Sequence, residues 1–217
     1  MENYTYETTD LQQNLETYEW DSTWIDHANK HYENRILYIG DSISCGIRFL
    51  ATKMTGNKIL FDGFGTSKAL DNPYFYDCLR LFVAQQPFRR AILFNNGLHG
   101  WHLDDEKEYK YHYEKMIHFL LSEFPNTPLY IVLTTHITDP ERETRVIRRN
   151  QVAKELAKKY DLPVIDLYQI SLDSAHLLDN GGVHWLQDPK IGLPAVLDGS
   201  PSSLARNFSP KGPRRHA

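Results

Sequence analysis

Five short apolar runs constrain the fold of this chain more than any other feature. They are rich in Ile, Leu, Val, Phe and Tyr, and each is nearly continuous instead of alternating with polar residues. The runs read RILYIG (35–40), KILFDGF (58–64), RAILFNN (90–96), PLYIVLTT (128–135) and LPVIDLY (162–168). Continuous runs of about four to eight residues are typical of strands covered on both faces. The set therefore predicts a sheet buried between two layers.

Segments with helical character separate these runs. After the second run, Asp71 or Asn72 is expected to cap a helix with Pro73 in its first turn. The last segment opens with acidic residues and closes with lysines, as the helix dipole prefers. The four segments span residues 42–54, 71–86, 104–124 and 139–160. Strands that alternate with helices predict an α/β fold, in which a five-stranded parallel sheet carries helices on both faces.

The 217 residues are enough for one domain with a sizeable core, which we place at residues 35–186. An N-terminal extension, residues 1–34, precedes it. The first 18 residues are polar and aromatic and predict a loosely attached arm, whereas residues 20–32 predict a short helix capped at Asp21 or Ser22. Residues 187–217 contain five of the eleven prolines and no helical period, so they predict an irregular tail.

Composition and charge limit the expected partners and location. The net charge is −4 and no basic block stands out, so we expect no nucleic-acid partner. No apolar run approaches the roughly 20 residues of a membrane span. The start, MENYTYETTDLQQ, lacks the basic and apolar regions of a signal peptide, which predicts a cytoplasmic location unless a leader was removed. Neither the two cysteines nor the histidine pairs at 27/31 and 99/102 have a convincing third ligand, so we expect no metal.

The first apolar run ends abruptly in Gly40, Asp41 and Ser42. One interpretation is structural: Gly40 turns the backbone, and Asp41 or Ser42 caps the next helix. The other is that Ser42 is a nucleophile held at a strand end. Ligands bind at the carboxyl ends of the strands in such sheets. The second interpretation therefore predicts other polar groups directly after strands.

Such groups follow three of the other runs. Gly65 can offer a backbone N–H with no side chain in the way, and its Gly-x-Gly setting is too short for a dinucleotide fingerprint. Asn95 and Asn96 fit either an Asn-Gly turn or an amide donor that faces a site. A glycine-flanked loop near the end carries His184, with the carboxylate Asp179 nearby. A lone histidine is more often structural, but four such groups at strand ends favour a shared site.

A hydroxyl, a glycine N–H, an amide and an imidazole together suit acyl transfer. The imidazole takes the serine proton as general base, and the serine attacks an ester carbonyl. N–H donors then stabilise the oxyanion that develops, each typically contributing about 3 kcal/mol to lowering the barrier.

These motifs resemble those of the SGNH (GDSL) hydrolase family, which is named for Ser, Gly, Asn and His. GDSI is similar to the first block and gives Ser42 the nucleophile's place, where its N–H also serves the oxyanion hole. FGTS resembles the second block and gives Gly65 an oxyanion N–H. NNGLHG resembles the third, with Asn95 in the oxyanion role and Asn96 where Asp is common. GGVHW resembles the last block and makes His184 the base.

The resemblance spans roughly residues 35–186 and implies a flavodoxin-like three-layer sandwich without a metal or organic cofactor. The family's acid normally lies three residues before the histidine, where this chain has Gly181. Either Asp179 orients the imidazole, or the site is a Ser–His dyad aided by a backbone carbonyl. The family also ends in an amphipathic helix that residues 187–217 do not resemble. An apolar face left uncovered there would favour a homo-oligomer.

The resemblance implies a serine esterase that hydrolyses short-chain, acetyl-type esters, with carbohydrate esters among the candidate substrates. The expected partner is a small-molecule or carbohydrate acyl ester. We expect the substrate to be bound by Asp41, Asn96, His99, Trp101 and Trp185. Two alternatives stay open: an acyltransferase that uses the same Ser–His site, and a non-catalytic flavodoxin-like binding protein.

Overall fold

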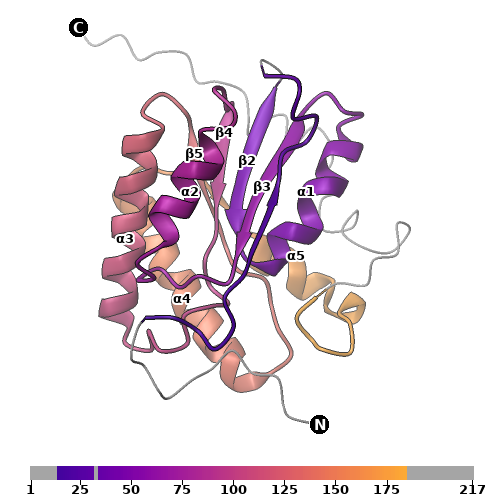
Figure 1. The fold of residues 1–217 in the computed structure, drawn as a ribbon. Coiled ribbons are helices and arrows are strands. Elements are labelled where there is room, and N and C mark those ends of the chain that lie inside the picture. The colour runs from indigo at the N-terminus through magenta and orange to yellow at the C-terminus, as the bar shows by residue number, and fades with distance from the viewer. Residues whose placement is uncertain (1–13, 32–33, 185–217) are drawn as a thin grey trace, which may run out of the picture.

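A six-stranded sheet forms the centre of the computed structural model, which describes residues 14–31 and 34–184 (Figure 1). The strand order is β1-β3-β2-β4-β5-β6, and all neighbours are parallel except β1 and β3. The strands are β1 (Asp21–Trp24), β2 (Arg35–Gly40), β3 (Leu60–Thr66), β4 (Ala91–Phe94), β5 (Leu129–Val132) and β6 (Val164–Ile165). The five parallel strands confirm the predicted ones, and their order is the flavodoxin-like one.

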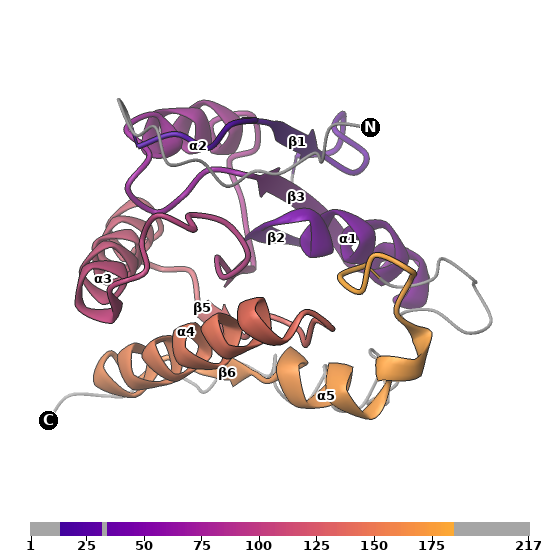
Figure 2. The ribbon, with the colours of Figure 1, turned by 90° about the horizontal axis from the view of Figure 1, so that it is seen from below.

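Helices cover both faces of this sheet, as Figure 2 shows edge-on. They are α1 (Ser42–Met54), α2 (Phe75–Val83), α3 (Glu106–Glu123), α4 (Pro140–Lys159), α5 (Leu167–Asp173) and a 3₁₀ turn (Ala175–Leu177). Alternate residues of β2 serve the two layers: Leu37 and Ile39 pack with α2, α3 and α4, whereas Ile36 and Tyr38 pack with α1 and α5. The predicted three-layer α/β fold is confirmed. The carboxyl ends of the parallel strands lie together at one end of the sheet.

The helix predicted at residues 20–32 is wrong, because Asp21–Trp24 form the edge strand β1 instead. The open edge of β3 offers unpaired backbone groups, and β1 pairs with them antiparallel, Asp21 opposite Thr66. Asp21 caps no helix here: it accepts hydrogen bonds from Thr66 Oγ1 at 2.7 Å and Lys68 Nζ at 2.8 Å. The predicted extension is therefore not helical within its described residues, and the predicted count of five strands becomes six.

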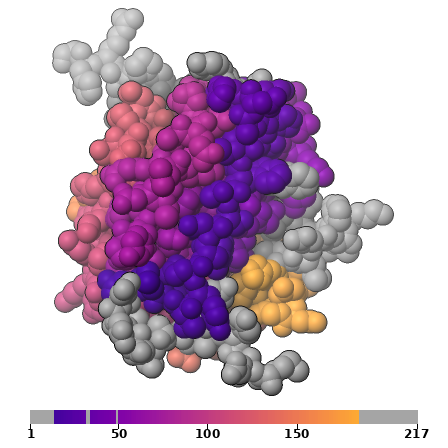
Figure 3. Space-filling model, viewed as in Figure 1, coloured from indigo at the N-terminus to yellow at the C-terminus, as the bar shows by residue number. Residues whose placement is uncertain are grey.

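Part of the arm expected to be loosely attached is packed, since Glu16 is buried, whereas Asn14 and residues 17–19 are exposed. Figure 3 shows the N-terminal described residues, in indigo, lying as a band against later parts of the chain. Glu19 and Trp20 both bond the hydroxyl of Ser67, which follows β3. We call residues 14–24 the strap. The tail predicted at residues 187–217 lies outside the described residues.

The second predicted helix starts later than expected, at Phe75. Its expected caps have other partners. The side-chain Oδ1 of Asn72 accepts from the Tyr74 N–H at 2.9 Å within a turn, and Asp71 pairs with His102 at 2.9 Å. Within the described ranges, no helix is both long and apolar enough to cross a bilayer.

Candidate active site

Ser42 lies where β2 gives way to α1, at the carboxyl edge of the sheet. Asp41 is the N-cap, and its carboxylate accepts from the Ile43 N–H at 3.0 Å. Ser42 is the first residue of the helix, so its N–H is among those without an intrahelical partner. Burial raises the pKa of the Asp41 carboxyl, and the imidazoles of His99 and His184 oppose that rise. Both interpretations of the strand end therefore fit the geometry, since Asp41 caps the helix that presents Ser42.

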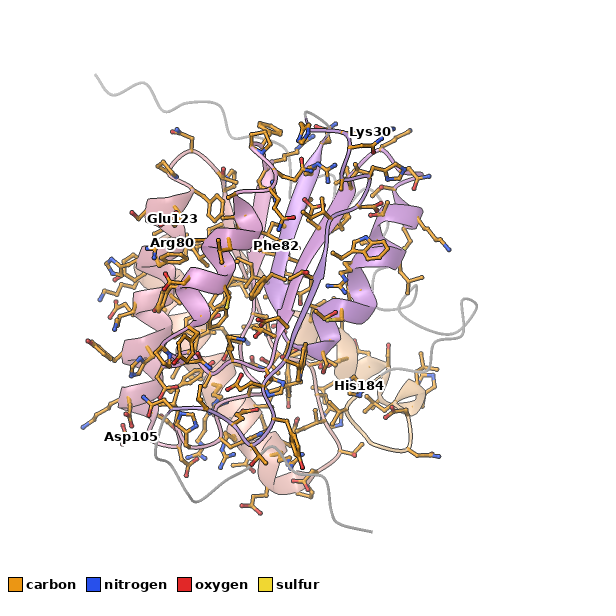
Figure 4. All side chains as sticks on the ribbon, viewed as in Figure 1. Lys30, Arg80, Phe82, Asp105, Glu123 and His184 are labelled. Atoms are coloured by element: carbon orange, nitrogen blue, oxygen red, sulfur yellow. The ribbon has the colours of Figure 1, made fainter. Side chains whose placement is uncertain are left out.

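His184 is placed against Ser42, with 2.8 Å between its Nε2 and the serine Oγ. Figure 4 shows His184 at the same end of the molecule as Asp105, opposite the end that carries Lys30. Backbone bonds hold its loop: Thr138 N–H donates to Gly182 O at 3.0 Å, and Asp179 N–H donates to His184 O at 2.7 Å. Gly182 has φ +66°, which favours glycine at this turn.

The carboxylate of Asp179 is turned toward its own loop. It accepts a hydrogen bond from the Gly181 N–H at 3.0 Å. In the described part of the chain, the His184 ring makes one hydrogen bond, to Ser42, and no ion pair. The role expected for Asp179 as the orienting acid is untested, and we use the Ser–His dyad, the other alternative that the sequence leaves open, for the prediction below.

Gly65 lies on β3 directly beside the end of β2, opposite Gly40. A Cβ at this position would overlap Cys45 Sγ and would lie 3.5 Å from Asp41 O. Glycine therefore lets β3 approach the nucleophile's strand end closely.

Asn95 and Asn96 both follow β4, but their amides already donate to neighbouring segments. Asn95 Nδ2 donates to Val132 O and to Thr134 Oγ1, each at 2.9 Å. Asn96 Nδ2 donates to Lys68 O at 3.0 Å. The expected oxyanion role of Asn95 stays a prediction, and it requires one of those two bonds to be exchanged.

The aromatic residues expected to bind the substrate differ in where they lie. His99 is buried, and its Nδ1 lies 2.8 Å from Glu16 Oε2 in the strap. Trp101 lies under guanidinium groups of α4, with Arg145 at 4.4 Å from the ring centroid and Arg142 at 5.2 Å. Trp185 lies outside the described residues.

Glu16 is the residue near this site that the sequence did not predict. It is only 7% exposed, although its neighbours in the sequence are polar. No local pattern marks it, because its burial depends on a contact 83 residues away. Among the described residues, no three His, Cys, Asp or Glu side chains are grouped to hold a metal ion.

A hydroxyl next to an imidazole allows proton transfer from oxygen to nitrogen, which is the arrangement that makes serine nucleophilic. The pair lies at the sheet edge where α/β proteins bind ligands. The arrangement therefore supports attack on an electrophilic carbonyl.

No protein-family model and no curated protein matches the chain. Solved structures do match it. A lipase/acylhydrolase from Enterococcus faecalis is 20% identical, with a TM-score of 0.55 over 71% of this chain and 88% of that one. A GDSL-like lipase from Bacteroides thetaiotaomicron is 13% identical, with a TM-score of 0.57 over 81% and 87%. An acetyl xylan esterase is 16% identical, with a TM-score of 0.55 over 70% and 91%. At these identities the similarity is one of fold.

Proposed function

We propose that this chain, which has the fold of the SGNH (GDSL) hydrolases, is a serine esterase that removes short acyl groups through an acyl-enzyme. The observation that carries the proposal is the 2.8 Å separation between Ser42 Oγ and His184 Nε2. The solved structures of similar fold include lipases, acylhydrolases and an acetyl xylan esterase, which supports this reaction class.

The proposed reaction has two steps. His184 Nε2 takes the Ser42 proton as the oxygen attacks the ester carbonyl, and the same nitrogen returns the proton to the leaving alcohol. Water then attacks the acyl-enzyme with His184 again as base. The N–H groups of Ser42 and Gly65 are the proposed backbone donors to the oxyanion. Asp41 would contribute by capping α1 and so fixing the position of Ser42.

We propose acetyl-type esters as substrates, with acetylated carbohydrates as the natural class. The acetyl xylan esterase of the same fold supports this choice. Turnover of p-nitrophenyl acetate, butyrate and octanoate tests it, and we expect kcat/KM to fall as the chain lengthens. A preference for octanoate would overturn the short-chain proposal.

Two further measurements separate the remaining alternatives. Labelling by a fluorophosphonate is expected for any serine enzyme, and its absence would indicate a binding protein. Faster p-nitrophenol release with an added acceptor alcohol, and an ester of that alcohol among the products, would indicate an acyltransferase.

Asp179→Asn should reduce kcat only a few-fold. In a triad, loss of the acid costs up to about 10⁴ in kcat, but this carboxylate accepts from Gly181 N–H and not from the ring. Asparagine keeps an oxygen that can accept the same bond. Steady-state kinetics on p-nitrophenyl acetate would check this, and a loss of 10³ or more would establish Asp179 as the orienting acid.

A further inference from the structure

The strap carries a buried carboxylate into the loop that follows β4. The Glu16 carboxylate accepts two hydrogen bonds from neighbouring residues of that loop: one from the ring Nδ1–H of His99 at 2.8 Å and one from the backbone N–H of Gly100 at 2.6 Å. The side chains are 2% exposed for Glu16 and 9% for His99. Trp20, also in the strap, meets the His99 ring edge-on at 5.9 Å. The strap therefore fixes the orientation of one imidazole.

The sheet topology takes the loop that carries this imidazole across the strand end that precedes the nucleophile. Strand β2 lies between β3 and β4. The loop after β4 reaches across to the segment after β3, since Asn96 donates to Lys68 O and a Cβ on Gly100 would lie 2.9 Å from Ala69 Cβ. It must pass over the end of β2, where Ser42 begins α1.

The same loop is held from the other side by α4. The buried Arg149 guanidinium donates to His99 O at 2.6 Å and to Gly100 O at 2.5 Å. Burial lowers the pKa of Arg149 to about 10. With its backbone fixed by Arg149 and its ring fixed by Glu16, His99 has little freedom to turn. The opposition of His99 and His184 to the raised pKa of Asp41 also places both rings near that strand end.

The bond to Glu16 distinguishes the two ring nitrogens of His99. Because Nδ1 donates to the carboxylate, Nε2 lies on the edge of the ring directed away from Glu16. An imidazole that donates through Nδ1 carries a proton on Nε2 only when it is the imidazolium, and the Glu16 carboxylate supplies the counter-charge for that form. The amides of Asn95 and Asn96 already donate elsewhere.

We propose that His99, oriented by Glu16, is the side-chain donor to the oxyanion in this site. This inference rests on the proposed function. In this proposal His99 is the imidazolium, so its Nδ1–H stays bonded to Glu16 while its Nε2–H bonds to the negative oxygen that forms when Ser42 attacks. The second bond weakens when the carbonyl re-forms. No proton is transferred in this interaction. His99 would touch the reacting atoms, whereas Glu16 would be a positioning residue.

The test compares His99→Ala with His99→Gln on p-nitrophenyl acetate. We expect His99→Ala to lower kcat by about 10²–10³ with KM little changed, because the bond is made in the transition state. His99→Gln should retain much of the activity, since its amide is again a donor. Glu16→Gln keeps the shape but not the charge, so we expect a loss of about tenfold in kcat, as charge-assisted bonds are roughly twice as strong as neutral ones.

The chain contains a matched control in the same loop. His102 pairs with Asp71 at 2.9 Å, and both side chains are buried. His102→Ala and Asp71→Asn remove a similar pair, so they report the effect of loosening the loop alone, and both should keep kcat within a few-fold.

Two results would overturn the inference. One is a kcat for His99→Ala within threefold of wild type. The other is an equal loss of kcat in the control variants. Loss of kcat in Asn95→Ala without loss in His99→Ala would assign the oxyanion to the amide instead. A fluorophosphonate adduct on Ser42 of the wild-type protein shows separately whether the proposed function holds.

Discussion

Ser42→Ala should abolish ester hydrolysis and fluorophosphonate labelling while leaving the fold intact. Removing the nucleophile of a serine hydrolase costs about 10⁶ in kcat, because the remaining groups have no oxygen to activate. Alanine is a good helix former, and Asp41 would still cap α1 through the Ile43 N–H. Turnover of p-nitrophenyl acetate and circular dichroism of the same sample would check both parts.

Ser44→Ala is the matched control for this variant. Ser44 lies two residues further along α1, but it is buried and its hydroxyl donates to Asp41 O at 2.7 Å. The Ser44→Ala variant should therefore still be labelled by the fluorophosphonate. Mass spectrometry that located the adduct on Ser44 or Ser67 would contradict the assignment of Ser42.

His184→Ala should cost nearly as much as loss of the serine. Nucleophile and base act as a unit, so removing either alone costs about 10⁶ in kcat in a well-studied serine hydrolase. His184 is exposed, so added imidazole should reach the empty place and restore part of the rate. Initial rates across an imidazole titration would measure this rescue.

His176→Ala is the control, since His176 is also exposed and lies on the 3₁₀ turn before the same loop. It should retain wild-type kcat and show no imidazole dependence. Activity in His184→Ala above one-tenth of wild type would exclude this residue as the base.

The parallel strands could be predicted because each is buried on both faces and so reads as a continuous apolar run. All six residues of β2 are buried, for example. Strand β1 could not be predicted in the same way, because three of its four residues are exposed and none is buried. Its pairing depends on the open edge of β3, which is a tertiary property. The late start of α2 has a similar cause, since Asp71 bonds His102 instead of capping the helix.

In the candidate site, too, some features could be predicted from the sequence and others depend on tertiary contacts. Ser42 and His184 follow from residue type and place after a strand, and the structure brings them together. The direction of the Asn95 amide does not follow, because Thr134 on the next strand's end accepts from it. Glu16 lies in a polar stretch whose burial depends on a loop far along the chain, so its contact with His99 required the structure.

The Ser42–His184 contact joins segments of unequal resistance to local unfolding. Ser42 begins a helix that packs on a central strand, whereas His184 is exposed on a glycine-rich loop. Segments with few buried contacts open at a lower free energy than the core. Activity should therefore disappear at urea concentrations where the sheet still gives its full circular dichroism signal. Initial rates at saturating ester, measured across the same urea series as the circular dichroism signal, would show activity falling at the lower urea concentration. Coincident curves would mean that loop and sheet unfold as one cooperative unit.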